Sequence, residues 1–331
     1  MSARFAVLGA GRIGQVHARA VASSAVASLV AVADAVPAAA ASLSEQYGCR
    51  VGEVDALIAA PDVDAVIICT PTDTHADLIE SAARAGKAIF CEKPIDLDAD
   101  RVRACLGVVA DTHARLMVGF NRRFDPHFAA LKAAVDAGEI GEVEQVVITS
   151  RDPAAPPLEY IRRSGGLFRD MMIHDLDIAR WVLGEEPVRV SAFGSVLTDP
   201  AIAGEDVDTA TAMLSTASGK QAVITNSRRA SYGYDQRVEV HGSTGMLRFG
   251  NPRNSLVEHA AAGGYTREPL QDFFMARYVE AYANELTRFV AWVAGDDVTV
   301  PTGEDGLRAL LLADAAAASV ATGETQAVVQ P

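Results

Sequence analysis

The sequence predicts an α/β chain in two parts, a doubly wound parallel sheet followed by an α+β domain with a large, mostly antiparallel open sheet. Two observations predict this fold class. In the first third, short apolar runs alternate regularly with helical patterns. After about residue 126, apolar runs follow one another through tight turns. With 331 residues the chain is long enough for about two domains, which we expect over residues 1–121 and 122–331.

Composition limits the class of protein. Half of the residues are hydrophobic and 22% are charged, which is typical of a globular chain. The formal net charge of −14 argues against nucleic acid or an anionic membrane as a partner. The four cysteines have no paired spacing, and Arg4–Ala10 leads directly into folded structure. We therefore expect reduced thiols in a cytoplasmic protein without a leader or a membrane span.

The first elements have the order strand, glycine turn, helix, strand and acid. They are Arg4–Leu8, Gly9–Gly14, a helix through His17–Val21, Leu29–Ala33 and Asp34. Of the three glycines, the first permits a tight turn, the second lets a diphosphate approach the backbone, and the third lets helix pack on strand. The N–H groups at the start of the helix would bind the diphosphate. The order favours a dinucleotide site over an ordinary glycine turn.

Asp34 predicts which dinucleotide is bound. It follows Gly14 by 20 residues, where a carboxylate can accept both hydroxyls of the adenosine ribose. A 2′-phosphate would meet this negative charge, so NAD is favoured over NADP. Arg12 is nearby but belongs to the glycine turn.

The alternation continues to about residue 119, and polar residues follow the strands. The predicted helices are Asp55–Ala60, Thr74–Ala85 and Asp98–Ala110, and the predicted strands are Ala65–Thr70, Ala88–Cys91 and Arg115–Gly119. Ligands of such sheets bind beyond the carboxyl ends of the strands. The residues there include Thr70-Pro71, Glu92-Lys93-Pro94 and Asn121-Arg122-Arg123.

Lys93 is a candidate donor because the chain has only four lysines and a proline fixes this one at a strand end. An exposed Glu-Lys dipeptide is the alternative. Thr70–His75 reads as a loop and helix cap that is also compatible with a contact to the cofactor.

The second part holds further strands and a helix that carries an acid and a histidine. Its expected strands are Val143–Ser150, Val188–Val196, Asp208–Leu214, Gln221–Asn226, Gln236–His241 and Met246–Phe249, and its closing helices are Arg277–Ala294 and Gly306–Thr322. A sheet face rich in Thr, Ala and Ser predicts cover by another subunit. Within Gly165–Trp181, Asp170 and His174 are four residues apart, on one face of a predicted helix. A carboxylate beside an imidazole can tune a proton acceptor, although a satisfied core pair would look the same.

These motifs resemble a known family. The glycine pattern, Glu92-Lys93-Pro94, and Asp170 with His174 after a Gly-Gly pair are similar to the glucose–fructose oxidoreductase/inositol dehydrogenase/rhizopine catabolism (Gfo/Idh/MocA) superfamily. The strings at 121–125, 150–153, 168–177, 226–229 and 232–235 resemble inositol 2-dehydrogenases within it. The resemblance implies a two-domain NAD-dependent oxidoreductase, commonly a homotetramer, that oxidises a cyclic polyol to a ketone.

The resemblance also implies site residues. Lys93, Asp170 and His174 would be catalytic, with His174 as the base. The expected cofactor-binding residues are Gly9, Gly11, Arg12, Ile13, Gly14, Asp34, Thr70, Pro71, His75, Glu92 and Lys93. The expected substrate-binding residues are Asn121, Arg122, Arg151, Asp152, Asp170, His174 and Tyr234. Asp177 could bond a hydroxyl or act as an exposed cap.

Several alternatives stay open. The substrate is expected to be myo-inositol, with scyllo-inositol or an aldose as alternatives. An NAD-dependent glycosidase of the same fold and an NAD-sensing binding protein are the other classes. A metal enzyme using His174, Asp170 and Asp175 is disfavoured because no second histidine forms a ligand-like pair.

Overall fold

The computed structural model describes residues 2–331, which form two compact units. The first unit contains the chain up to Asp125, the segment Glu280–Leu310 and Pro331. The second unit contains Pro126–Val279 and Leu311–Gln330. The first unit thus includes residues from near the C-terminus of the chain.

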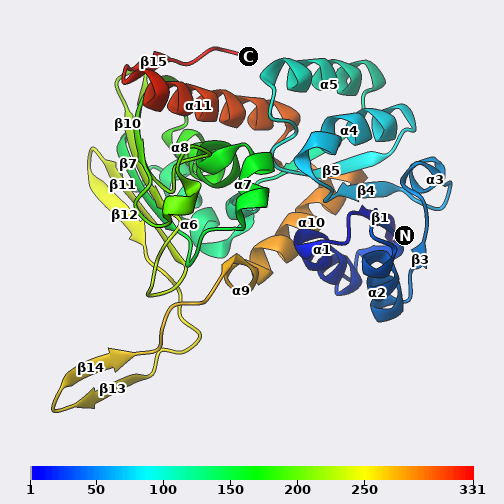
Figure 1. Cartoon of the computed structure of the whole chain (residues 1–331), viewed down its shortest axis with the longest axis horizontal. Helices are drawn as coiled ribbons and strands as arrows, with labels where there is room; N and C mark the ends of the chain where they lie inside the picture. Colours follow the sequence, from blue (N-terminus) through cyan, green and yellow to red (C-terminus); the bar gives the residue numbers. More distant parts are fainter. Residues whose placement is uncertain (1) are drawn as a thin grey trace. The chain divides into compact units, whose positions relative to one another are not determined.

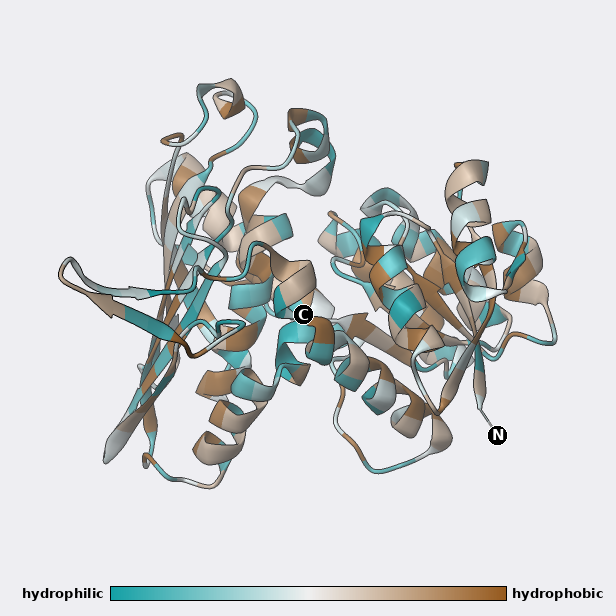
Figure 2. Ribbon diagram, turned by 90° about the horizontal axis from the view of Figure 1, so that it is seen from below, coloured by the Kyte–Doolittle hydropathy of each residue, from teal (hydrophilic) through white to brown (hydrophobic). Residues whose placement is uncertain are grey.

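A six-stranded parallel sheet organises the first unit, in the order β3-β2-β1-β4-β5-β6. Its strands are β1 Ala3–Leu8, β2 Ala27–Ala33, β3 Arg50–Val51, β4 Ala65–Ile68, β5 Ala88–Glu92 and β6 Leu116–Gly119. All residues of β4 and β5 are buried, as expected when helices cover both faces. In Figure 2, which colours the ribbon by the hydropathy of each residue, the strands inside this unit are mostly brown. The predicted doubly wound sheet is confirmed.

Helices and short turns connect these strands (Figure 1). They are α1 Arg12–Ala22, α2 Pro37–Tyr47, α3 Val54–Ala59, α4 His75–Arg84 and α5 Ala99–Thr112, with 3-10 turns at Thr72–Thr74 and Asn121–Phe124. One further helix, α10 (Val279–Ala294), joins the core of this unit. Its Phe289 ring lies 6.0 Å from that of Phe5 and 5.8 Å from that of Phe90.

The second unit is built on a seven-stranded sheet in the order β12-β11-β7-β10-β9-β8-β15. Only the β7–β10 pair is parallel among its described strands, so the predicted mostly antiparallel sheet is confirmed. The strands are β7 Val143–Arg151, β8 Pro187–Ser195, β9 Thr209–Thr216, β10 Gln221–Ser227, β11 Asp235–Gly242, β12 Gly245–Phe249 and β15 Gln326–Ala327. A separate hairpin, β13 Glu258–Ala261 and β14 Gly264–Arg267, projects from this unit (Figure 1).

The two faces of this sheet differ. On one face, α8 packs against β7 and β10 and covers apolar side chains such as Val146 and Ile224. The opposite face carries Phe193, Met213 and Met246, of which Phe193 is 76% exposed. This face therefore carries exposed apolar side chains among charged ones such as Arg237 and His241.

The helices of the second unit depart from the sequence prediction in two places. They are α6 Pro126–Asp136, α7 Leu158–Ser164, the π-helical turn η3 Phe168–Met172, α8 Ile173–Leu183, α9 Phe274–Arg277 and, shared with the first unit, α11 Gly303–Thr322, with a 3-10 turn at Pro200–Ile202. The predicted helix past Gly165 is present but contains the π-turn, and the helix expected from Arg277 is divided between α9 and α10. Periodicity alone reveals neither feature because apolar residues continue through both.

Two further observations concern the state of the cysteines and the apolar character of the helices. Cys49, Cys69, Cys91 and Cys105 are free and buried. Across residues 2–331, no helix is long and apolar enough to cross a membrane.

Candidate active site

The turn between β1 and α1 is shaped by glycine. Gly9 has a φ of +101°, and a Cβ there would lie 2.6 Å from the backbone of Cys69. A Cβ on Gly14 would lie 1.9 Å from the carbonyl oxygen of Gly9, so only glycine lets α1 approach the turn this closely. Around Gly11, by contrast, a Cβ would meet no atom within 4 Å. Close packing therefore requires glycine at positions 9 and 14. At position 11 the open space fits a ligand that approaches the backbone at the start of α1.

Asp34 follows the end of β2 and braces this turn. Its Oδ2 accepts a hydrogen bond of 2.5 Å from the Ala10 N–H, and its Oδ1 accepts one of 2.7 Å from the Val36 N–H. The carboxylate predicted to bind ribose therefore also fixes the loop at which a dinucleotide would lie. Asp34 and the glycine turn together are suited to the ribose and the diphosphate of NAD.

His75 ties two strand ends together. It is buried, with Nδ1 2.8 Å from the Pro94 carbonyl oxygen and Nε2 2.8 Å from that of Thr70. Burial lowers the pKa of His75, although both carbonyls favour its charged form. The loops after β4 and β5 are thereby joined. Its predicted contact with the cofactor stays a prediction.

Glu92 ends β5 inside the protein. Its Oε1 lies 2.6 Å from Nε2 of the buried His17, whose ring packs edge-on to Phe90 and Tyr282. The fully buried Glu285 of α10 belongs to the same region, and burial, together with the charge of Glu92, raises its pKa well above the usual value. The residue before Lys93 is therefore anchored in the core, which fixes the backbone from which Lys93 leaves the strand.

The loop after β6 carries two of the predicted substrate-binding residues. Asn121 and Arg122 lie in a 3-10 turn and are both buried. The next residue, Arg123, forms a 2.9 Å ion pair with Asp305. Buried polar side chains at a strand end are suited to binding, and this assignment stays a prediction.

In the second unit, Asp170 lies in the π-turn and His174 in the first turn of α8. Tyr160 of α7 donates a 2.9 Å hydrogen bond to Oδ1 of Asp170. Arg228, which follows β10, places Nη2 3.6 Å from Oδ2 of the same carboxylate. A hydroxyl donor and a cation thus contact the two oxygens of Asp170 from separate elements.

Sequence reasoning missed Tyr160 and Arg228. A signal for Arg228 was present, because Ala222, Ile224 and Asn226 alternate along the buried face of β10 and Arg228 continues the period of two. Tyr160 carries no comparable signal, since α7 is a single short helix.

Two acids of α8 have structural partners. Asp175 is fully buried and accepts a 2.8 Å hydrogen bond from Nδ2 of Asn226 on β10. Asp177 is buried, with Oδ1 3.5 Å from Nη1 of Arg180, so of its two alternatives the exposed cap is wrong. Asp177 lies within α8, where a helix position facing the core buries it.

The other predicted substrate residues contact different partners. Nη1 of Arg151 donates a 2.7 Å hydrogen bond to the Tyr232 hydroxyl. The Asp152 N–H donates to the Ser227 carbonyl oxygen at 2.9 Å. Tyr234 is buried, and its ring lies 6.1 Å from those of Phe273 and Tyr278. Their role in binding substrate stays a prediction.

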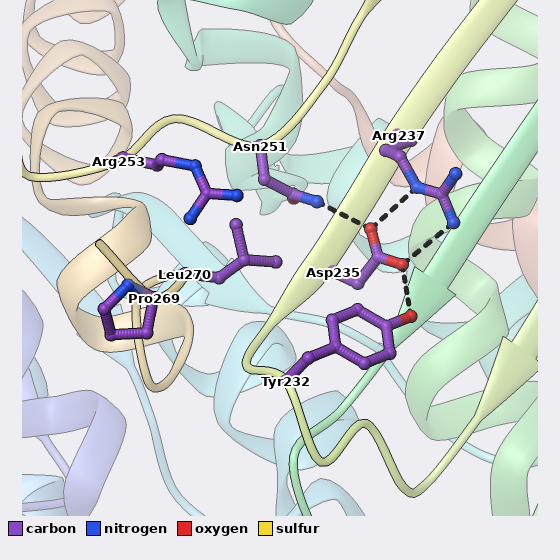
Figure 3. A pocket seen from close by; sticks show the side chains of 7 residues that line it. All are labelled: Tyr232, Asp235, Arg237, Asn251, Arg253, Pro269 and Leu270. Carbon is purple, nitrogen blue, oxygen red and sulfur yellow. Dashed lines mark hydrogen bonds and ion pairs between the residues drawn. The ribbon is translucent and has the colours of Figure 1, made fainter. Parts of the chain in front are cut away.

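A cavity of about 540 Å³ lies beside Tyr232 (Figure 3). Its walls are formed by Tyr232, Asp235, Arg237, Asn251, Arg253, Pro269 and Leu270. Asp235 accepts hydrogen bonds from Tyr232, Arg237 and Asn251, so its charge is compensated within the wall. None of the predicted catalytic residues lines this cavity. Among the residues that the structure describes, no group of three or more His, Cys, Asp and Glu side chains could hold a metal ion.

Comparisons with known proteins cover both units. Residues 3–120 match the model of an oxidoreductase family with an NAD-binding Rossmann fold, and residues 128–248 match the GFO/IDH/MocA C-terminal domain. The inositol 2-dehydrogenase of Rhizobium meliloti (strain 1021) is 65% identical, over 97% of this chain and 98% of that protein.

Two solved structures are similar over nearly their full length. The myo-inositol dehydrogenase of Corynebacterium glutamicum has a TM-score of 0.95 and 43% identity, covering 100% of both chains. The scyllo-inositol dehydrogenase of Lactobacillus casei, with bound NAD(H) and scyllo-inositol, has a TM-score of 0.92 and 32% identity, covering 99% of both chains. The chain therefore belongs to the GFO/IDH/MocA family of NAD-dependent oxidoreductases.

Proposed function

We propose that this protein oxidises a cyclic polyol with NAD⁺, and that its substrate is myo-inositol, converted to 2-keto-myo-inositol. The observation that carries the proposal is Asp170, a carboxylate supported by Tyr160 and Arg228 and located four residues before His174. An acid supporting an imidazole is suited to removing a hydroxyl proton near neutral pH. The inositol dehydrogenases similar to this chain support the substrate class.

The catalytic set would be Lys93, Asp170 and His174. His174 removes the proton of the hydroxyl that is oxidised, and Asp170 orients the imidazole and stabilises its cation. Lys93 donates to the same oxygen and stabilises its developing negative charge. When bound, NAD⁺ would supply the hydride acceptor for the carbinol carbon, which becomes the carbonyl carbon.

Residues 1–121 would bind the cofactor and residues 122–331 the substrate. Gly9, Gly11 and Gly14 would hold the diphosphate at the start of α1, and Asp34 the ribose. The remaining cofactor contacts would come from Arg12, Ile13, Thr70, Pro71, His75, Glu92 and Lys93, and the substrate contacts from Asn121, Arg122, Arg151, Asp152 and Tyr234 in addition to Asp170 and His174.

The test is a spectrophotometric assay of NAD⁺ reduction with inositol isomers and aldoses. We expect steady NADH production, fastest with myo-inositol, and weaker production with NADP⁺ because Asp34 would face the 2′-phosphate. Faster NAD⁺ reduction with scyllo-inositol or an aldose would show that this compound, and not myo-inositol, is the preferred substrate. Cleavage of a chromogenic glycoside without net NADH would instead favour a glycosidase, and NAD binding without turnover of any of these compounds would favour a sensor.

Exposed apolar side chains on the outer face of the large sheet support assembly. Phe193, Met213 and Met246 lie on this face. We infer that a second copy covers it in a homotetramer, since such side chains on a sheet face are suited to a contact between identical copies. Light scattering after size exclusion should give a mass of four chains, and a monomer would contradict this. The free buried cysteines support a cytoplasmic location.

A further inference from the structure

Arg228 is a cation held inside the second unit. Only 1% of its surface is exposed, and its Nη2 lies 3.6 Å from Oδ2 of Asp170 and 3.6 Å from Oδ2 of Asp206. These are ion-pair separations, longer than hydrogen bonds. Buried charges require compensation, and here one cation lies between two carboxylates.

The backbone before the π-turn fixes Asp206. The Leu167 N–H donates a 2.8 Å hydrogen bond to Oδ2 of Asp206. A Cβ on Gly166, whose φ is +78°, would lie 2.6 Å from Oδ1. The second glycine of the Gly-Gly pair therefore leaves room for this carboxylate, which links the pair to Asp170 through Arg228.

The backbone of Arg228 is also fixed. Its N–H donates a 2.8 Å hydrogen bond to the Asp208 carbonyl oxygen. The carboxylate of Asp208 accepts hydrogen bonds from the N–H groups of Leu197, Thr198 and Asp199. The segment that carries Asp206 and the end of β10 thus form one hydrogen-bonded unit.

Other polar groups near this cluster already have partners of their own. Tyr160 of α7 bonds Asp170, and Asn226 of β10 bonds Asp175 of α8. Two ion pairs join neighbouring segments, Arg162 with Glu205 at 2.8 Å, and Arg169 with Asp314 of α11 at 2.6 Å. Burial raises the pKa of Asp206, while the Val207 N–H, Arg228 and the Leu167 N–H oppose this and the charge of Asp170 adds to it.

We propose that Arg228 and Asp206 are positioning residues for Asp170, with Asp206 holding the guanidinium and Arg228 holding Oδ2 of Asp170. This inference rests on the proposed function, in which Asp170 supports His174. The two residues contribute both geometry and charge. They do not touch the substrate in this proposal; they determine where Asp170 stands and how strongly it supports the imidazolium.

Removing a charge from the cluster and changing only its geometry should affect the pKa of His174 differently. Removing the cation in Arg228→Met leaves His174 in a more negative environment, so its pKa rises. Removing the anion in Asp206→Asn leaves the guanidinium less compensated, so the pKa of His174 falls. Arg228→Lys keeps the charge, but an ammonium group lacks the planar fork that spans two carboxylates.

The experiment compares these three variants with the wild type and with Arg162→Met, which removes an exposed arginine from an ion pair of the same unit. The acidic limb of kcat/KM for myo-inositol should move to higher pH in Arg228→Met and to lower pH in Asp206→Asn. It should stay in place in Arg162→Met. In Arg228→Lys the limb should stay near that of the wild type while kcat falls by about tenfold to a hundredfold, since misplaced catalytic groups cost rates of this order.

A second measurement does not depend on turnover. The imidazole signal of His174, one of seven histidines, is assigned in NMR spectra of histidine-labelled protein by its loss in His174→Ala. Its titration should shift in the same two opposite directions. If the wild type reduces no NAD⁺ with any polyol, the proposed function fails while this titration still tests the cluster. Equal titrations in all variants, or shifts of one sign in both Arg228→Met and Asp206→Asn, would overturn the inference. Should Arg228→Met not fold, Asp206→Asn and Arg228→Lys decide it.

Discussion

The glycine turn of the first unit and the charge cluster of the second unit are constructed in different ways. In the turn, the absence of side chains at Gly9 and Gly14 sets the backbone, and Asp34 braces it from the next strand. In the cluster, Asp170 is held by the side chains of Tyr160 and Arg228, which come from separate elements. Steric exclusion therefore builds one site, and compensation of buried charge builds the other.

This difference explains what the sequence could predict. The parallel sheet and the glycine turn were predictable because periodicity and the spacing of glycines are local signals. Asp170 and His174 were singled out because they are four residues apart. The supports of Asp170 could not be found this way, since residues 160, 206 and 228 come together only when the sheet forms. The alternative of an exposed cap for Asp177 was wrong for the same reason, because its burial depends on packing.

The largest effect on activity should come from a change in the charge cluster around Asp170 and His174. We expect His174→Ala to reduce kcat by about a hundredfold to ten-thousandfold, because a general base is lost, with NAD binding largely kept. Steady-state kinetics and a separate titration of NAD binding measure the two effects. Turnover close to that of the wild type would exclude His174 as the base.

The glycine turn of the first unit should lose stability when a single methyl group is added. Gly14→Ala places a Cβ 1.9 Å from the Gly9 carbonyl oxygen, which backbone cannot avoid without moving. We expect a loss of about 3 kcal/mol in the free energy of unfolding, together with weakened NAD binding. Chemical denaturation checks it, with Gly107→Ala as the control, because a Cβ there meets nothing within 4 Å. Equal stability of the two variants would show that the turn tolerates side chains.

Asp208 tests charge compensation by backbone donors in the second unit. Burial acts to raise its pKa, but the N–H groups of Leu197, Asp199 and Thr198 lower it to about 2. Because the folded-state pKa is below the unfolded value, the stabilisation is complete above about pH 4 and is lost as the pH falls towards 2. Asp208→Asn should cost about 2 kcal/mol of unfolding free energy at pH 6 and less at lower pH. Asp136→Asn, an exposed change, is the control, and a pH-independent difference would contradict the assignment.

Glu285, in the first unit, should make the free energy of unfolding depend on pH with the opposite sign. Burial, and then the charge of Glu92, raise its pKa, so the folded protein keeps the proton after the unfolded chain has lost it. Stability then falls as the pH rises above the unfolded value of 4.5, by about 1.4 kcal/mol per pH unit for one proton. Glu285→Gln should remove this slope between pH 5 and 6 in urea denaturation, while the exposed Glu280→Gln should retain it. Identical slopes in both variants would place the titration elsewhere.

The π-turn at Phe168–Met172 makes segment length part of the candidate site. A π-turn closes its hydrogen bonds over five residues where an α-helix uses four, so it holds one residue more than the helix would need. Deleting one residue there would let the segment close as an α-helix, with the residues on both sides keeping their faces. Asp170 lies within the five residues of the π-turn, so its own position relative to Tyr160 and Arg228 would change. A relative with every site letter conserved but a gap at this point should accordingly hold this acid in a different place.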